Sequence, residues 1–404
     1  MSPGASHGFR GVLPMTSRAG AALALALLAG CGQMSAAPPS ASPAPSATAS
    51  PTPLPPPSPT PTATETPTAT ATPRPAGLGA LADAIGLELG VQMTGDLYQT
   101  NPAWNEILLK DFNSVTIDRG LYWPGNTENP NAPFDSSVVD PQVAYALSQG
   151  MRVRGHPLLY PTNPALQGGW SQDGNFSSAD LSQIITHHVS EVVSHYQGVV
   201  KEWVVVNEAY KPGHMTYLFF RILGPNYIDL AFAAARRADP TAVLLYNDGD
   251  NETSRGLTTA ATRAIVARLK AKGLIDGVGL QMHLGGNDPP QKADVIATMR
   301  SFGVPVYVTE FDVNLGEVGG DQTQRFAIQA EIYRNMLQAC LESGVCKGFT
   351  FWGVGDRYSW LETRLDAVPN ADPTLFDNQL QPKPAYFAVR DVLRAWSQTP
   401  VPTP

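Results

Sequence analysis

Two glutamates each follow directly on a short apolar segment. Glu208 follows residues 203–207, and Glu310 follows residues 305–309. One carboxylic acid that protonates a leaving oxygen and one carboxylate that attacks an anomeric carbon are the pair that cleaves a glycosidic bond with retention. A single such glutamate is equally well explained by a place beside a helix N-terminus or by an ion pair at the rim of a core. The two together make glycosidic cleavage the chemistry to consider.

Further polar and aromatic residues stand at the ends of other apolar segments. They are His156, Asn207, Asn247, Asp248, Gln281, His283 and Trp352. Buried polar groups cost free energy unless they are partnered, so such a gathering is hard to explain by stability. With Asn207, Gln281 and His283 beside them, Glu208 and Glu310 are interpreted as a catalytic pair.

The elements that must position these residues alternate along the chain. Eight apolar segments have the character of buried strands, at 87–92, 114–116, 152–156, 203–207, 242–247, 277–282, 305–309 and 348–352. Helical patterns lie between them, at 178–196, 227–238, 258–272 and 322–343 among others. Eight strand–helix units predict an α/β protein, a single (β/α)8 TIM barrel with its chemistry at the C-terminal strand ends. Periodicity alone leaves a doubly wound open sheet as the alternative.

The N-terminus is predicted to be an export signal. Residues 1–30 contain an apolar run at 21–30 that is too short to span a bilayer but fits a signal peptide. The run ends in a sequence that resembles a bacterial lipobox, which implies lipidation of Cys31. An ordinary secretory signal with a coincidental cysteine is the alternative, and Met15 is an alternative start.

Composition divides the rest of the chain. Residues 31–78 are rich in Pro, Thr, Ser and Ala, so they cannot bury enough apolar surface to fold and should form an extended linker. Residues 79–397 are predicted to form the barrel, and 398–404 a disordered tail. We therefore expect an exported protein at the extracellular face of the cell envelope, held there by the lipid on Cys31 or else secreted.

The net charge of −8 argues against nucleic acid as a partner and suits a neutral substrate. No group of Cys and His residues has zinc-like spacing. We expect neither a metal nor a cofactor, and a monomer.

Seven segments together resemble glycoside hydrolase family 10, the endo-1,4-β-xylanase family. They are 203–208, 223–228, 245–248, 276–283, 309–312, 351–360 and 381–386. The resemblance extends over about residues 85–395 in the family's order. It implies endo-hydrolysis of β-1,4 bonds in xylan by double displacement, with Glu208 as acid/base and Glu310 as nucleophile.

The resemblance also implies roles for other residues. Asn207 would bond the sugar 2-hydroxyl in the −1 subsite, and Gln281 and His283 would orient the nucleophile. The remaining implied substrate contacts are His156, Trp352, Trp360, Trp123, Asp118, Arg119, Tyr122 and Tyr160. For Trp352 and Trp360, core packing is the alternative. Cys340 and Cys346 resemble a disulfide of secreted members, with two reduced cysteines as the alternative.

The glycone side departs from the family pattern. Asp118, Arg119 and Tyr122 replace the family's glutamate, asparagine and lysine, and Tyr160 and Pro161 replace a tryptophan and a histidine. Arg119 is expected to pair with an acidic group on a decorated sugar; the alternative is that it points to solvent. These changes leave open the same chemistry on another β-glycan or an oligosaccharide. A non-catalytic glycan-binding lipoprotein is a further alternative, against which both glutamates argue.

Overall fold

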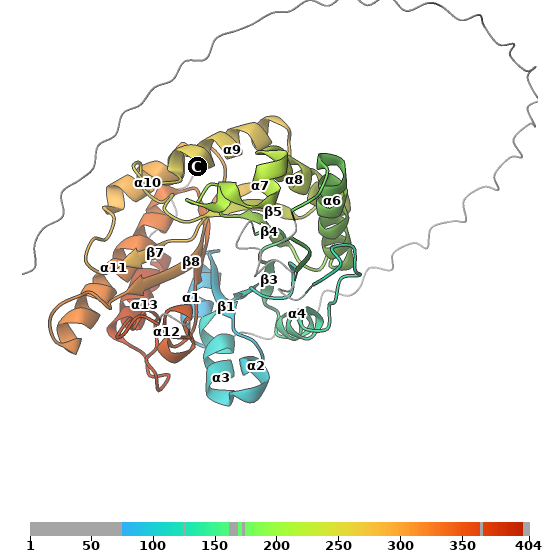
Figure 1. Ribbon diagram of the computed structural model, residues 1–404. Helices are drawn as coiled ribbons and strands as arrows, with labels where there is room; N and C mark the ends of the chain where they lie inside the picture. Colours follow the sequence, from blue (N-terminus) through green and yellow to red (C-terminus); the bar gives the residue numbers. More distant parts are fainter. Residues whose placement is uncertain (1–74, 124–126, 161–168, 172–173, 364–366, 399–404) are drawn as a thin grey trace, which may run out of the picture. The chain divides into compact units, whose positions relative to one another are not determined.

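The computed structural model describes residues 75–123, 127–160, 169–171, 174–363 and 367–398 (Figure 1). The predicted signal peptide, Cys31, nearly all of the predicted linker and the tail from 399 lie outside these residues, so those assignments remain predictions. In the part of the chain that is described, no helix combines the length and apolar character needed to cross a membrane.

Eight parallel strands close into a barrel. They are β1 (Glu88–Met93), β2 (Ser114–Ile117), β3 (Arg152–Gly155), β4 (Glu202–Asn207), β5 (Val243–Asp248), β6 (Gly277–Leu280), β8 (Val306–Asn314) and β9 (Cys346–Phe351). Each pairs with the next, β6 pairs with β8, and β9 returns to pair with β1. The predicted TIM barrel is confirmed, and the open sheet is excluded because the first and last strands are joined.

One short strand was not predicted. β7 (His283–Gly285) runs parallel to the far end of β8, with His283 opposite Asp312. It forms because β8 continues beyond the barrel rim to Asn314, while the chain after β6 turns at Met282, which has a φ of 61°. This extension places His283 beside β8 instead of within the barrel wall.

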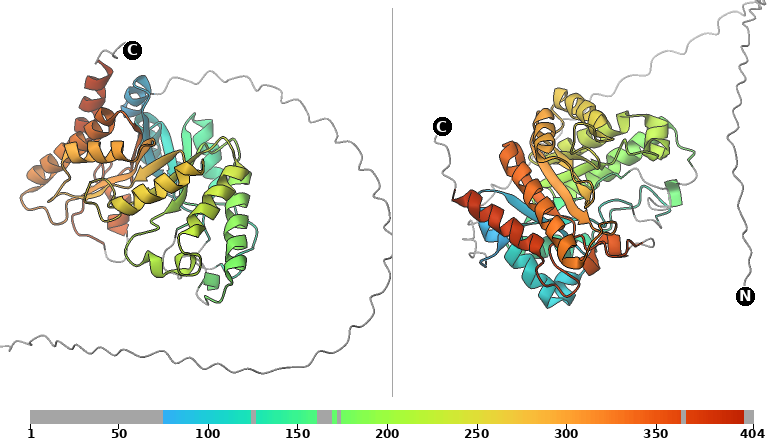
Figure 2. Two further views of the ribbon diagram at one scale, coloured as in Figure 1. Left: turned by 90° about the horizontal axis from the view of Figure 1, so that it is seen from above. Right: turned by 90° about the vertical axis from the view of Figure 1, so that its left-hand side faces the viewer.

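Helices form the outer layer around the strands (Figures 1 and 2). They are α1 (Leu78–Ala84), α2 (Leu97–Thr100), α3 (Pro102–Asp111), α4 (Val139–Ser148), α6 (Ser178–His195), α7 (Leu218–Leu223), α8 (Asn226–Ala238), α9 (Thr259–Ala271), α10 (Lys292–Ser301), α11 (Gln322–Ser343), α12 (Trp360–Thr363) and α13 (Pro384–Ser397). Short 3-10 turns lie at η1 (Gly169–Ser171), η2 (His214–Thr216) and η3 (Asp356–Tyr358). The predicted helix at 178–196 begins as expected, with the Ser177 hydroxyl accepting from the Asp180 backbone N–H.

The interior of the barrel holds both apolar and charged groups. Strand β4 is buried on both faces, so Trp203, Val204, Val205 and Val206 are all inaccessible to solvent. Of these, Val204 packs with Leu245 and Tyr307 in a separate small cluster. On the neighbouring strand, the buried Arg154 guanidinium lies 2.8 Å from Glu88 and 2.8 Å from Glu202. Removing one partner of such a buried group is costly, so this cluster ties three strands together.

A disulfide joins Cys340 near the end of α11 to Cys346 at the start of β9. The pair is the one implied by the resemblance. It closes the turn that leads from α11 to β9, the final strand.

Candidate active site

The ends of four strands bring the predicted polar residues to one rim. Asn207 is the last residue of β4, Asn247 lies near the end of β5, Gln281 follows β6, and Glu310 lies within β8. All four side chains are almost fully buried. They come together because parallel strands in a closed barrel end on the same side.

Glu208 stands where β4 breaks. Its φ is 55°, a left-handed conformation that costs a non-glycine residue roughly 1–2 kcal/mol. Its backbone N–H donates to the Asn247 carbonyl at 2.9 Å, and its carbonyl lies 2.8 Å from Nδ1 of His214. These contacts hold the turn that directs its side chain to the rim. Strained backbone conformations of this kind cluster at functional sites.

The Glu310 carboxylate is surrounded by donors. Asn247 Nδ2 donates to its Oε1 at 2.7 Å, and His283 Nε2 lies 3.2 Å from its Oε2. His156 Nε2 lies 3.6 Å from Oε1. Burial acts to raise the pKa of Glu310, but His156, His283 and the Asn247 hydrogen bond outweigh it and lower that pKa. Glu310 is therefore an ionised carboxylate at neutral pH.

His283 bridges two carboxylates. Its Nδ1 lies 2.9 Å from Asp312 Oδ1, and Trp360 Nε1 donates to Asp312 Oδ2 at 2.8 Å. Burial lowers the pKa of His283, but Asp312 and Glu310 together raise it to about 10. The ring is thus a cation at neutral pH, and it places a fixed positive charge beside Glu310.

Four donor side chains approach Glu208. Gln281 Nε2 donates to Oε1 at 2.8 Å, Lys211 Nζ to Oε1 at 3.1 Å, and the Tyr160 hydroxyl to Oε2 at 3.0 Å. His214 Nδ1 lies 3.8 Å from Oε2. Tyr160 was predicted to line a sugar subsite, and it also contacts this carboxylate.

Asn207 links the two glutamates. Its Oδ1 accepts from Asn247 Nδ2 at 2.9 Å and from Gln281 Nε2 at 3.2 Å. Each of those amides also donates to one carboxylate, Asn247 to Glu310 and Gln281 to Glu208. Because Oδ1 is held as the acceptor, Nδ2 of Asn207 is the donor end of its amide.

The predicted aromatic residues fall into two groups. The Trp352 ring lies 5.3 Å from that of His156, and the Trp360 ring lies 5.1 Å from that of His283, measured between centroids. Both therefore stand at the rim. Trp123 is instead stacked on His188 of α6 at 3.9 Å, with its Nε1 donating to the Pro130 carbonyl. The structure does not bring Trp123 to the pair, since this packing buries its ring.

The residues that replace the family's glycone contacts are placed unequally. Asp118 accepts a hydrogen bond from Gln92 and lies 3.9 Å from His156, so it reaches the rim. Burial raises the pKa of Asp118 and also that of the neighbouring Tyr122. The Arg119 side chain is 88% exposed and 4.0 Å from Asp118, which matches the alternative that it points to solvent.

Four residues that contact the pair were given no specific role from the sequence, although Asn247 was among the polar residues noted at strand ends. They are Lys211, His214, Asn247 and Asp312. A signal existed for two of them. Asp312 lies two residues after Glu310 on one strand, so both side chains face the same way. Asn247 is the second-last residue of β5, which pairs with β4. Lys211 and His214 lie in the irregular segment after Glu208, whose course no periodic pattern predicts.

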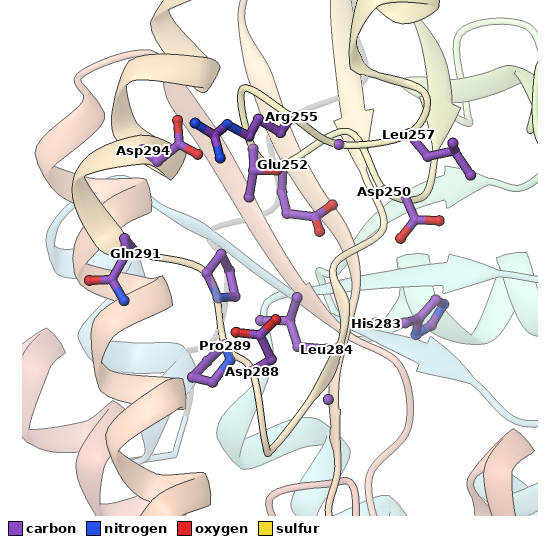
Figure 3. A pocket seen from close by; sticks show the side chains of 14 residues that line it. Asp250, Glu252, Arg255, Leu257, His283, Leu284, Asp288, Pro289, Gln291 and Asp294 are labelled. Carbon is purple, nitrogen blue, oxygen red and sulfur yellow. The ribbon is translucent and has the colours of Figure 1, made fainter.

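A pocket of about 670 Å³ lies next to His283 (Figure 3). The segments after β5 and around β7 form it, and it shares His283 with the cluster. The charged lining residues labelled in Figure 3, besides His283, are Asp250, Glu252, Arg255, Asp288 and Asp294. Neither Glu208 nor Glu310 is among its lining residues.

Residues 77–392 match the family model described as glycosyl hydrolase family 10. The chain belongs to glycosyl hydrolase family 10. Among similar proteins, endo-1,4-beta-xylanase B of Thermotoga neapolitana is 31% identical, over 78% of this chain and 91% of the relative. The resemblance seen in the sequence is thereby confirmed.

Solved structures of family 10 glycosyl hydrolases agree with this fold. Native xylanase 10B of Thermotoga maritima has a TM-score of 0.73 at 28% identity and covers 80% of this chain and 99% of its own. Xylanase 10B of Thermotoga petrophila, solved in complex with xylobiose, has a TM-score of 0.73 at 27% identity, covering 80% and 98%. Among the described residues of this family 10 chain, no group of three or more His, Cys, Asp or Glu side chains is placed to hold a metal ion.

Proposed function

We propose that this family 10 hydrolase cleaves internal β-1,4 bonds of xylan with retention of anomeric configuration. The similar proteins named above are called endo-1,4-beta-xylanases or xylanases, which supports this substrate. The observation that carries the proposal is the Glu310 carboxylate, held ionised beside the His283 cation, with Glu208 linked to it through Asn207.

In the first step, Glu310 attacks the anomeric carbon while Glu208 gives its proton to the leaving oxygen. The glycosidic bond breaks and a covalent bond to Glu310 forms. In the second step, Glu208 takes a proton from a water molecule, and the resulting hydroxyl displaces Glu310. This double-displacement mechanism requires the carboxyl groups of Glu208 and Glu310 to be about 5–5.5 Å apart, the spacing of retaining enzymes.

The surrounding residues have roles that follow from their places. The donor end of Asn207 is assigned to the sugar 2-hydroxyl, a hydrogen bond that strengthens in the oxocarbenium-like transition state. His156, Trp352 and Trp360 are assigned to the sugar in the −1 subsite. Asn247 and the Asp312–His283 pair position Glu310 and maintain its charge.

A second substrate is supported by the rebuilt glycone side. Asp118 and Tyr160 stand where the family's pattern has other side chains, and Tyr160 contacts Glu208 directly. Another β-glycan or an oligosaccharide is therefore the runner-up. A non-catalytic glycan binder is disfavoured, since it needs no proton donor and nucleophile together.

The test is release of reducing ends from a panel of xylans and other β-glycans by the purified protein. We expect the highest kcat/KM on xylan, products of several lengths from an early time point, and the β-anomer formed first in proton NMR. An α-anomer formed first would contradict retention, and activity confined to another glycan would replace the substrate.

We also propose export and lipidation at Cys31, with the enzyme held at the extracellular face of the envelope. The support is the sequence of residues 1–31 alone.

A further inference from the structure

Lys211 is a cation in direct contact with the carboxylate assigned as acid/base. Its Nζ lies 3.1 Å from Glu208 Oε1, and Lys211 follows Glu208 by three residues in the chain. Its side chain is 39% exposed, and that of Glu208 is 7% exposed. The charge on Lys211 therefore acts on a buried partner, with only part of it screened by water.

The charges around this contact are mainly negative. The titratable or polar groups that face Glu208 or Lys211 from the adjoining elements are Tyr160, His214, Asp248, Asp250 and Gln281. The charge of Glu310 acts on Tyr160. Burial raises the pKa of Asp248 to about 7, and the charge of Glu208 adds to that rise. The positive charge of Lys211 partly balances the carboxylates of Glu208, Asp248 and Asp250.

The attraction is visible on the lysine itself. Burial acts to lower the pKa of Lys211, but Glu208 raises it overall, through charge and through the hydrogen bond, with Asp248 and Asp250 adding to the rise. Such an interaction is mutual: what stabilises the ammonium beside a carboxylate equally stabilises the carboxylate beside the ammonium.

We propose that Lys211 is a positioning residue that favours the ionised form of Glu208 and so sets the alkaline limit of hydrolysis. The inference rests on the proposed role of Glu208 as acid/base. Glu208 must carry a proton when the glycosidic bond breaks, because a sugar is a poor leaving group. Lys211 works against that state, and it favours the carboxylate that the second step needs as a base.

The experiment measures kcat/KM against pH for the full-length protein on xylo-oligosaccharides. Lys211→Met keeps the aliphatic stem and removes the charge, and Lys211→Gln keeps a hydrogen-bond donor without the charge. Lys211→Arg restores the cation. The matched control is Lys292→Met, which removes a lysine of similar exposure that pairs with Glu342 at 2.9 Å, away from Glu208.

We expect the alkaline limb to move to higher pH by about one unit in Lys211→Met and Lys211→Gln. Lys211→Arg and Lys292→Met should keep the wild-type limb. On an aryl xyloside with a strongly acidic leaving phenol, the first step needs no proton from Glu208, so the alkaline limbs of Lys211→Met and the wild type should coincide.

An unmoved alkaline limb in both neutral variants would overturn the proposal, even if activity fell equally at every pH, since that fall would indicate a merely structural lysine. Failure of the proposed function looks different: the wild type itself would then release no sugar from any glycan, or a Glu208→Ala variant would retain full activity on xylo-oligosaccharides.

Discussion

His283 lies between Glu310 and Asp312, with Nε2 3.2 Å from the first carboxylate and Nδ1 2.9 Å from the second. One imidazolium thus neutralises part of two negative charges on the same strand. The arrangement keeps the proposed nucleophile ionised while preventing the strand end from carrying two unbalanced charges, and it depends on β7 running beside β8.

The first prediction concerns stability and pH. Because the pKa of His283 is raised to about 10 from an ordinary 6.5, its contribution to stability is complete below about pH 6.5 and is lost as pH rises through about 10. Between pH 6 and pH 10, the Tm of the wild type should therefore fall by more than the Tm of the His283→Gln variant. Thermal melts of both proteins at each pH measure the difference; equal losses would contradict the assigned charge.

The second prediction separates the two glutamates. Glu310→Ala should lower kcat on every substrate by at least about a thousandfold, because no covalent intermediate can form. Glu208→Ala should lose about 10²–10⁴-fold on xylo-oligosaccharides but much less in the first step on aryl xylosides with good leaving groups. Burst kinetics on a series of leaving groups give the comparison. If both variants respond alike across the series, the two roles are misassigned.

The third prediction concerns the disulfide. Its loop is short, with a sequence separation of 6, so removing it in Cys340→Ser/Cys346→Ser should cost about 2 kcal/mol of unfolding free energy by the chain-entropy estimate. Urea denaturation with matched m-values measures this cost. Thiols that react freely with an alkylating reagent in the native, exported protein would show that the bond does not form.

The fourth prediction concerns Arg119. The hypothesis that it pairs with an acidic substituent requires a higher kcat/KM on glucuronic-acid-bearing xylo-oligosaccharides than on plain ones. Since the Arg119 side chain is 88% exposed, we expect the preference to be small, at most about fivefold. Kinetics of wild type and Arg119→Asn/Tyr122→Lys on both substrates measure it. No preference in the wild type and no gain by the variant on plain substrate would end the hypothesis.

The fifth prediction concerns Cys31, which lies outside the described residues. Metabolic labelling with a fatty acid in a bacterial host should mark the wild type and leave Cys31→Ala unlabelled. A wild type that appears unlabelled in the medium would indicate an ordinary secretory signal instead.

The sequence by itself determined the barrel and the identity of the reactive pair. Apolar segments of the right length predicted the eight strands, and Glu208 and Glu310 directly follow two of those segments in the sequence. Once the barrel closes, the two glutamates lie on the same rim, because all parallel strands of a barrel end there.

Only the tertiary structure decided which side chains surround that pair. Lys211 reaches Glu208 through an irregular segment, and Tyr160 donates to the same carboxylate from 48 residues away. Trp123 packs on His188, although Asp118 on the same segment after β2 reaches the rim. Such contacts depend on strand register and loop course, which place side chains to within an ångström. A local sequence pattern indicates whether a segment is a helix or a strand, but not where each side chain lies in space.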